Sequence, residues 1–214
     1  MTLPPTAVAV LLGGPSAEHD VSLVSGRAIA GALAGNGHDV SGWLLTLTGE
    51  WWRLPARALD PELPLEAYRD PAALGADGPH TAAAALELLA GATPAPIVFP
   101  ALHGPFGEDG QVQSLLEAAG LVYCGAGPAA SAVGMDKTLF KRVVATLELP
   151  VLPWAEVIAP ELAADRPGVL AGLRRFAAGF DDPRLIVKPA RQGSSIGVTI
   201  VHDVAGTALD EALD

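Results

Sequence analysis

The feature that most constrains this chain is a strand–helix–strand opening. Residues 6–14, TAVAVLLGG, form an apolar run that ends on two glycines, which predicts a buried strand and then a tight turn. Residues 20–37 have the spacing of a helix, and residues 38–47, HDVSGWLLTL, predict a second strand. Two strands joined by such a helix pair in parallel through a right-handed crossover. The chain is therefore predicted to begin as an α/β domain with a parallel sheet.

The same alternation continues to about residue 125. Residues 94–104, PAPIVFPALHG, predict a third buried strand, residues 108–120 a helix, and residues 121–125, LVYCG, a short fourth strand. Residues 48–80 are rich in Pro, Asp and Gly and predict a variable excursion at the edge of the domain. We assign residues 1–125 to this N-terminal α/β domain.

The pattern changes after residue 125 and predicts an α+β domain over residues 126–214. Two successive helices are expected between residues 127 and 148, a strand over residues 149–158 and an amphipathic helix over residues 167–180. Residues 184–189, RLIVKP, and 196–203, IGVTIVHD, predict neighbouring antiparallel strands because the loop between them is short.

Composition restricts the partners of the chain. Its net charge is −11, and its 13 Lys and Arg residues are spread along the sequence, which argues against nucleic-acid binding. Cys124 is the single cysteine, so an intramolecular disulfide is impossible. The N-terminal apolar run lacks a basic flank, and no segment approaches the ~20 apolar residues that span a bilayer. We expect no membrane partner and a cytoplasmic location.

Glu18 is the first candidate for a binding residue. It follows the glycine turn, where the start of a helix favours an anion, and its carboxylate could bind the ammonium group of a small ligand. The alternative is an ordinary acidic residue at a helix N-terminus. His103 is the second candidate, since residues 103–110, HGPFGEDG, follow the third strand at the sheet edge where ligands bind. A capped turn with solvated acids is the alternative there.

Residues 188–195, KPARQGSS, are the stronger candidate. A lysine on a strand, followed by a Gly-Ser-Ser loop, can surround phosphate oxygens with an ammonium group and several donors. The spacing is not that of a P-loop. A solvated hairpin is the alternative. Lys137 begins a helix, where a cation is unfavourable unless an anion or solvent is near.

Four segments together resemble the D-alanine–D-alanine ligases, which are ATP-grasp enzymes of peptidoglycan precursor synthesis. These segments occur in family order and read GGPSAEHDVSLVSG, HGPFGEDGQVQSLLEAAGLVYCG, SAVGMDKTLFK and IVKPARQGSSIGV. The resemblance implies a parallel-sheet N-terminal domain followed by an ATP-grasp subdomain. It also implies two D-alanines and ATP as substrates and an acyl phosphate intermediate.

The resemblance also implies roles for particular residues. Glu18 would hold the ammonium group of the first D-alanine, with Val21, Ser22 and His103 in the same subsite. Lys137 and Lys188 would neutralise ATP phosphates. Ser194 and Ser195 would lie in the loop over the γ-phosphate, with Ser194 orienting the second substrate, so that Glu18 and Ser194 act in catalysis.

The chain departs from the family pattern because it ends before the ATP-grasp portion is complete. Family members hold Mg²⁺ through an acid and a Glu-x-Asn pair, whereas the only asparagine here is Asn36. We therefore expect no metal ligands within this chain and no ligase activity from it alone, as a truncated or split form. The complete family enzyme is expected to be a homodimer. The alternatives are a non-catalytic binding module and a fragment of a D-alanyl-D-lactate or D-alanyl-D-serine ligase.

Overall fold

The computed structural model describes residues 5–214 and consists of two compact units, Met1–Met135 and Asp136–Asp214. Each unit has its own sheet and apolar core. Helix α4 (Pro128–Met135) belongs to the first unit. The assignment of a D-alanine-binding domain to residues 1–125 and an ATP-grasp subdomain to residues 126–214 stays a prediction.

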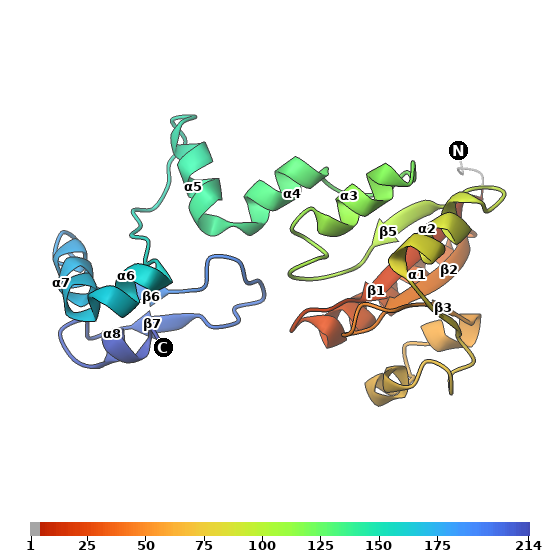
Figure 1. Cartoon of the computed structure of the whole chain (residues 1–214), viewed down its shortest axis with the longest axis horizontal. Coiled ribbons are helices and arrows are strands. Elements are labelled where there is room, and N and C mark those ends of the chain that lie inside the picture. Colours follow the sequence, from red (N-terminus) through yellow and green to blue (C-terminus); the bar gives the residue numbers. More distant parts are fainter. Residues whose placement is uncertain (1–4) are drawn as a thin grey trace. The chain divides into compact units, whose positions relative to one another are not determined.

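The first unit is built on a five-stranded sheet with the order β4-β3-β2-β1-β5. Strand β1 (Ala7–Gly13) lies between β2 (Asp39–Leu45) and β5 (Ile97–Pro100) and is parallel to both, as Figure 1 shows. Helix α1 (His19–Gly35) connects β1 to β2. The predicted strand–helix–strand opening and parallel sheet are therefore confirmed.

Two edge strands lie within the segment that was predicted to be a variable excursion. Strands β3 (Trp51–Leu54) and β4 (Asp77–His80) extend the sheet in antiparallel pairing, with the 3₁₀ helices η1 (Ala56–Leu59) and η2 (Leu65–Arg69) between them. The sequence interpretation missed these strands because each is only four residues long and turn-forming residues surround them. Pairing with β2 and burial of Trp51, which is 1% exposed, decide their structure.

Side chains of β1 alternate between the cores on the two faces of the sheet. Leu11 packs into a cluster with residues of α2 (Ala82–Ala90) and α3 (Gln111–Ala118). Leu12 packs into a second cluster with Leu23 of α1 and with residues of η1 and η2. Period-two alternation of this kind is what a strand buried on both faces requires. The fourth predicted strand is reduced to one parallel bridge between Val98 and Tyr123.

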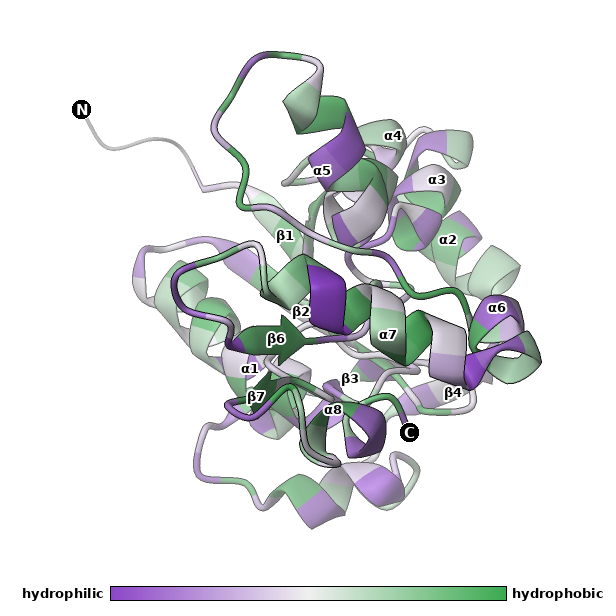
Figure 2. Ribbon diagram, turned by 90° about the vertical axis from the view of Figure 1, so that its left-hand side faces the viewer, coloured by the Kyte–Doolittle hydropathy of each residue, from purple (hydrophilic) through white to green (hydrophobic). Residues whose placement is uncertain are grey.

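The second unit has a two-stranded antiparallel sheet and several short helices. Strand β6 (Leu185–Val187) pairs with β7 (Thr199–Val201), and Ile186 lies opposite Ile200, so the predicted pair of antiparallel strands is confirmed. Both strands are strongly apolar, as their green colour in Figure 2 shows. The helices of this unit are α5 (Lys137–Ala145), α6 (Ala159–Ala164), α7 (Arg166–Ala177) and α8 (Ala208–Glu211).

The strand predicted for residues 149–158 is wrong. These residues have no strand or helix assignment, and α6 begins at Ala159. Pro150 and Pro153 lack the backbone N–H that a strand donates to its neighbour, which explains why an apolar segment here does not join the sheet. The predicted amphipathic helix is confirmed as α7, whose Leu170 and Leu173 are buried in the core of this unit.

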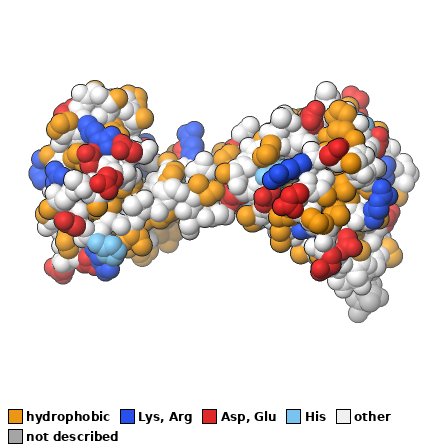
Figure 3. All heavy atoms as spheres, turned by 90° about the horizontal axis from the view of Figure 1, so that it is seen from below, with side chains coloured by type: hydrophobic (Ala, Val, Ile, Leu, Met, Phe, Trp, Pro, Cys, Tyr) orange, Lys and Arg blue, Asp and Glu red, His pale blue; other side chains and the backbone are white. Residues whose placement is uncertain are grey.

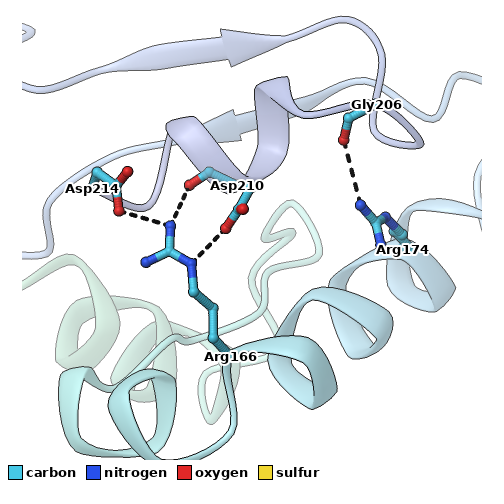
Figure 4. A network of polar contacts seen from close by, with 5 residues as sticks. All are labelled: Arg166, Arg174, Gly206, Asp210 and Asp214. Carbon is cyan, nitrogen blue, oxygen red and sulfur yellow. Dashed lines mark hydrogen bonds and ion pairs between the residues drawn. The ribbon is translucent and has the colours of Figure 1, made fainter.

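Arginines of α7 connect this helix to the last residues of the chain (Figure 4). The Arg166 guanidinium binds the carboxylate and the carbonyl oxygen of Asp210 and also contacts the carboxylate of Asp214 at 2.7 Å. Arg174 donates to the carbonyl oxygens of Val204 and Gly206. These contacts hold α8 against α7, although the two helices are far apart in the sequence.

Charged side chains of both signs lie among apolar ones on the face drawn in Figure 3. Among residues 5–214, no helix is long and apolar enough to cross a membrane.

Candidate functional site

Two turns of the first unit meet at one edge of its sheet. Glu18 lies in the turn after β1, and His103 lies in the loop after β5, which is the parallel neighbour of β1. Ser16 joins the two turns, since its Oγ donates to the carbonyl oxygen of His103 at 2.7 Å and accepts from the backbone N–H of Glu18 at 3.1 Å. Two predicted site residues that are far apart in the sequence are thus brought to the same carboxyl edge, where open α/β sheets bind ligands.

Glu18 is 2% exposed, and its carboxylate lies against the backbone of the second turn. A Cβ atom added to Gly104 would lie 2.5 Å from Oε2 of Glu18, and the φ of Gly104 is +72°. Glycine is therefore required at this position both for its backbone conformation and for the close approach of the carboxylate. A buried carboxylate of this kind can accept charged hydrogen bonds from an ammonium group.

Ser22 and Val21 differ in what they offer to a ligand. The buried hydroxyl of Ser22 accepts from the backbone N–H of Gly13 at 2.8 Å and donates to the carbonyl oxygen of Ala101 at 2.7 Å, so it ties β1 to the segment after β5. Val21 is 48% exposed at the start of α1. Ser22 therefore shapes this edge of the sheet, and Val21 offers apolar surface beside it.

Neighbours of Glu18 and His103 in the sequence have local structural partners. His19 Nδ1 lies 2.8 Å from the carbonyl oxygen of Gly14. Glu108 accepts from the backbone N–H of Gly104 at 2.6 Å, and Asp109 accepts from the backbone N–H of Phe106 at 2.9 Å. Glu108 and Asp109 therefore accept hydrogen bonds within their own turn, as the alternative of a capped turn predicts.

Ser25 was missed by the sequence interpretation. Its Oγ lies 2.9 Å from Nε2 of His103. The helical period could have indicated it, because Ser25 lies three positions after Ser22 and so on the same side of α1. What no local pattern shows is that the loop after β5 brings a histidine to that side.

Asp136 organises the start of α5 in the second unit. Its Oδ1 accepts from the backbone N–H groups of Thr138 and Leu139, at 3.1 and 3.0 Å, and its Oδ2 lies 2.9 Å from Nε of Arg191. The hydrogen bond from Leu139 and the Arg191 guanidinium lower the pKa of this carboxyl group. The carboxylate therefore caps α5, and its ion pair is with Arg191.

Lys137 connects α5 to the loop that follows Lys188. Its backbone N–H donates to the carbonyl oxygen of Ala190 at 3.0 Å, and its Nζ donates to the carbonyl oxygen of Gln192. The same loop contains Ser194 and Ser195, whose φ angles are +45° and +61°. Non-glycine residues in this left-handed region are uncommon, and they mark functional loops more often than chance would allow.

Lys188 follows β6 directly and lies close enough to Lys141 to affect it. Burial, and then the positive charge of Lys188, lower the pKa of Lys141. Lys141 Nζ also donates to the carbonyl oxygen of Leu152 at 3.0 Å and lies 5.4 Å from the centre of the Trp154 ring. Because the positive charge of Lys188 disfavours the ammonium form of Lys141, an anion is favourable at this place. The sequence interpretation included Lys188 and missed Lys141.

Among residues 5–214, no group of three or more His, Cys, Asp or Glu side chains is placed to hold a metal ion. The absence of metal ligands from this chain stays a prediction.

A shallow groove of about 380 Å³ lies elsewhere on the first unit. Its lining comes from β2, β3, η1 and the approach to β4, and it includes Arg53 and Asp77 but none of the predicted site residues. The candidate site is therefore assigned from the chemistry at the carboxyl edge of the sheet and not from this groove.

The family model that matches this chain and two of its curated relatives are all described as D-alanine–D-alanine ligases. Residues 7–126 match the family model described as D-ala D-ala ligase N-terminus. The D-alanine–D-alanine ligase of Kineococcus radiotolerans is 42% identical over 219 residues, and that of Streptomyces coelicolor is 40% identical over 223 residues. The alignments cover 96% and 97% of this chain and 56% of each relative, so the chain spans about half the length of these curated relatives.

Solved structures show the same fold. The D-alanine-D-alanine ligase of Coxiella burnetii superposes with a TM-score of 0.74 at 24% identity, over 97% of this chain and 59% of that one. The VanG D-Ala:D-Ser ligase of Enterococcus faecalis superposes with a TM-score of 0.69 at 26% identity, over 98% and 59%.

Proposed function

The chain belongs to the D-alanine–D-alanine ligase N-terminus family, and we propose that it carries the first D-alanine subsite and the phosphate-binding lysines of such a ligase. The observation that carries this proposal is the junction of the two turns, where the Ser16 hydroxyl accepts from the backbone N–H of Glu18 and donates to the carbonyl oxygen of His103, and where the Glu18 side chain is buried. It lies within the residues that match the family model.

Glu18 is proposed to accept hydrogen bonds from the ammonium group of the first D-alanine. Burial strengthens such a contact because little water competes for the carboxylate. Val21 and His103 line the same subsite, and Ser22 holds its floor through Gly13 and Ala101. A charged hydrogen bond of this kind is worth about 1.5–3 kcal/mol, which is roughly ten- to a hundredfold in affinity.

Lys137 and Lys188 are proposed to neutralise ATP phosphates, with Ser194 and Ser195 in a loop that covers the γ-phosphate and with Ser194 orienting the second substrate. The left-handed backbone at both serines supports a specialised loop. The positive charge of Lys188, which adds to burial in lowering the pKa of Lys141, supports an anion site. A carboxylate oxygen of the first D-alanine attacks the γ-phosphorus, and ADP leaves. The amine of the second D-alanine then attacks the acyl carbon, and phosphate leaves with formation of the peptide bond. Fixed cations stabilise the charge on the transferring group.

We propose that Mg²⁺ ligands come from the part of the ligase length that this chain does not span. Phosphoryl transfer of this type relies on metal ions to neutralise the phosphates. The 214-residue chain by itself is therefore expected to bind ATP weakly and to form no D-alanyl-D-alanine. A role in peptidoglycan precursor synthesis, a cytoplasmic location and a homodimeric complete enzyme stay predictions.

A D-alanyl-D-serine or D-alanyl-D-lactate ligase is the second candidate. The VanG D-Ala:D-Ser ligase shares the fold of this chain over almost its whole length at 26% identity, so the fold does not distinguish these acceptors. A non-catalytic module that binds D-alanine is the third candidate, and it predicts binding without turnover in any context.

A chimera tests these possibilities. Residues 1–214 are joined to the remaining C-terminal part of the Kineococcus radiotolerans ligase at the aligned position, and ADP release is measured with D-alanine, D-serine or D-lactate as acceptor. Release that requires D-alanine as donor supports the ligase proposal, and the preferred acceptor selects between the first two candidates. A folded chimera that binds D-alanine and releases no ADP supports the binding module.

Two substitutions in the chimera separate the proposed subsites. Glu18→Gln is expected to raise the KM for the first D-alanine roughly ten- to a hundredfold, because it replaces a charged acceptor by a neutral amide. Lys188→Ala is expected to raise the KM for ATP more than that for D-alanine. Glu87→Gln, on the exposed side of α2, is the matched control and should change neither. An unaltered D-alanine KM in Glu18→Gln would remove Glu18 from the site.

A further inference from the structure

Ser25 and His103 form a contact that joins helix α1 to the loop after β5. The Oγ atom of Ser25 lies 2.9 Å from Nε2 of His103, although 78 positions separate the two residues in the sequence. The other end of His103 is held from the turn before α1, because Ser16 Oγ donates to its carbonyl oxygen at 2.7 Å. Both the backbone and the ring of His103 are therefore positioned by the segment that carries Glu18.

The hydrogen on the Ser25 hydroxyl has a partner within the helix. Ser25 Oγ lies 2.9 Å from the carbonyl oxygen of Val21 and 3.4 Å from that of Ser22. A carbonyl oxygen only accepts hydrogen bonds, and a hydroxyl has a single hydrogen to donate. If that hydrogen were directed at the histidine, Oγ and the Val21 oxygen would face each other at 2.9 Å with no hydrogen between them. The hydroxyl therefore donates to Val21 and accepts from the ring.

We propose that Ser25 is a positioning residue that holds the neutral His103 ring with its hydrogen on Nε2 and leaves Nδ1 as a hydrogen-bond acceptor. The partner of one ring nitrogen decides which tautomer a histidine adopts. Among residues 5–214, Nδ1 of His103 has no hydrogen-bond partner, whereas Nε2 is engaged by Ser25. The ring nitrogen that remains for a ligand is thus an acceptor.

This assignment deepens the proposed function and rests on it for the identity of the ligand. An acceptor nitrogen in the loop whose Gly104 lies against the buried Glu18 carboxylate suits a ligand group that donates hydrogen bonds, such as the ammonium group of D-alanine. A carboxylate, which only accepts, would be disfavoured at the same nitrogen. Ser25 would then act on ligand binding through His103 without touching the ligand.

The tautomer can be measured on the 214-residue chain by ¹⁵N NMR of the histidine rings, at a pH high enough for the imidazole to be neutral. The five histidines are distinguished by the signal that His103→Gln removes. The parent chain is expected to show the hydrogen of His103 on Nε2 and an unprotonated Nδ1, with the Nε2 hydrogen protected from exchange with water. Ser25→Ala should abolish that protection, and Ser25→Thr should retain it because threonine keeps the hydroxyl.

Ser114→Ala is the matched control, since Ser114 on α3 also donates to a carbonyl oxygen one turn earlier, that of Gly110 at 2.7 Å. It should leave the His103 signals unchanged. A parent ring that carries its hydrogen on Nδ1 overturns the proposal, and so does a His103 spectrum that Ser25→Ala does not alter. The parent measurement decides the question even if Ser25→Ala fails to fold.

D-alanine binding to the same samples separates this proposal from the proposed function. The Ser25→Ala chain is expected to bind D-alanine about fivefold more weakly than the parent, and Ser25→Thr to bind it normally. If the parent has the hydrogen on Nε2 and binds no D-alanine, the D-alanine subsite is contradicted while the role of Ser25 is supported. If D-alanine binds and the hydrogen is on Nδ1, the D-alanine subsite is supported while the role of Ser25 is contradicted.

Discussion

The position of α1, and with it of Glu18 and Ser25, depends on a glycine at residue 26. Gly26 lies on the side of α1 that faces β1, and a Cβ atom added there would lie 2.5 Å from Cβ of Leu12. Leu12 is fully buried, and its Cβ is attached directly to the backbone of β1, so it cannot rotate away. Gly26→Ala must therefore move the helix away from the strand or strain both.

Gly31 provides a matched control on the same helix. It is exposed, and a Cβ atom added there would have no atom within 4 Å. Replacing a helical glycine by alanine stabilises a helix by about 0.8–1 kcal/mol at either position. Forcing an extra carbon into a well-packed core costs about 1–3 kcal/mol. We therefore expect Gly31→Ala to stabilise the first unit by close to 1 kcal/mol and Gly26→Ala to be neutral or to destabilise it by about 2 kcal/mol.

Urea unfolding followed by tryptophan fluorescence measures this difference. Trp43, Trp51 and Trp52 lie in the first unit and Trp154 in the second, so a Trp154→Phe background makes the signal specific for the first unit. The free energy of unfolding of Gly26→Ala should lie about 1–3 kcal/mol below that of Gly31→Ala. If the two variants are equally stabilised, α1 does not pack on Leu12 as closely as the structure has it, and the reasoning is refuted.

Three further predictions follow from buried or charged contacts. Arg27→Met should lower the free energy of unfolding of the first unit by about 2–4 kcal/mol, because the buried guanidinium donates to the carbonyl oxygens of Leu23, Asp60 and Leu63. The control is Arg57→Met, at an exposed arginine, which should change the urea midpoint little. Because its pKa is lowered on folding, Asp136 should stabilise the start of α5 above its unfolded pKa of about 3.9, and this contribution should be lost as the pH falls through the lower folded value. Amide exchange at Thr138 and Leu139 should therefore accelerate on acidification. Asp136→Asn can still cap the helix, and its amide exchange should depend less on acid. An equal acid dependence in the parent chain and in Asp136→Asn would contradict the role of the Asp136 carboxylate. Lys188→Gln should raise the pKa of Lys141, which is measured by ¹³C NMR titration of the lysine side chains. An unchanged pKa would mean that the two ammonium groups do not interact. The control is Lys137→Gln, which removes a cation that does not shift the pKa of Lys141.

Part of the candidate site could be predicted from the sequence because it depends on the ends of regular elements. One buried strand ends at the glycines at residues 13 and 14, shortly before Glu18, and another ends shortly before His103. Glu18 and His103 could therefore each be assigned to the end of a strand. Parallel pairing then puts such ends at one edge of a sheet. The same reasoning put Lys188 on a short strand over residues 184–189, and the structure has it directly after that strand, which ends at Val187.

Contacts between residues far apart in the sequence could not be predicted in this way. Ser25 meets His103 over 78 positions, and Asp136 meets Arg191 over 55 positions, and no local pattern indicates which turn or loop lies opposite which helix. The sequence also led to an incorrect strand at residues 149–158 and missed β3 and β4. Apolar composition indicates burial, but a strand also needs backbone N–H groups that bond to a neighbouring strand. Trp51 pairs with Leu45 of β2, whereas Pro150 and Pro153 have no N–H to donate.

The amino-acid sequence alone determined the parallel α/β opening, the antiparallel strands around Lys188 and the identity of the family. These follow from hydrophobic periodicity, turn residues and four ordered motifs, all of which are local properties of the chain. The tertiary structure alone decided the edge strands, the burial of Glu18 against Gly104 and the hydrogen bond that orients His103. Those features depend on which surfaces pack together, and packing is set by the whole set of long-range contacts and not by any one segment.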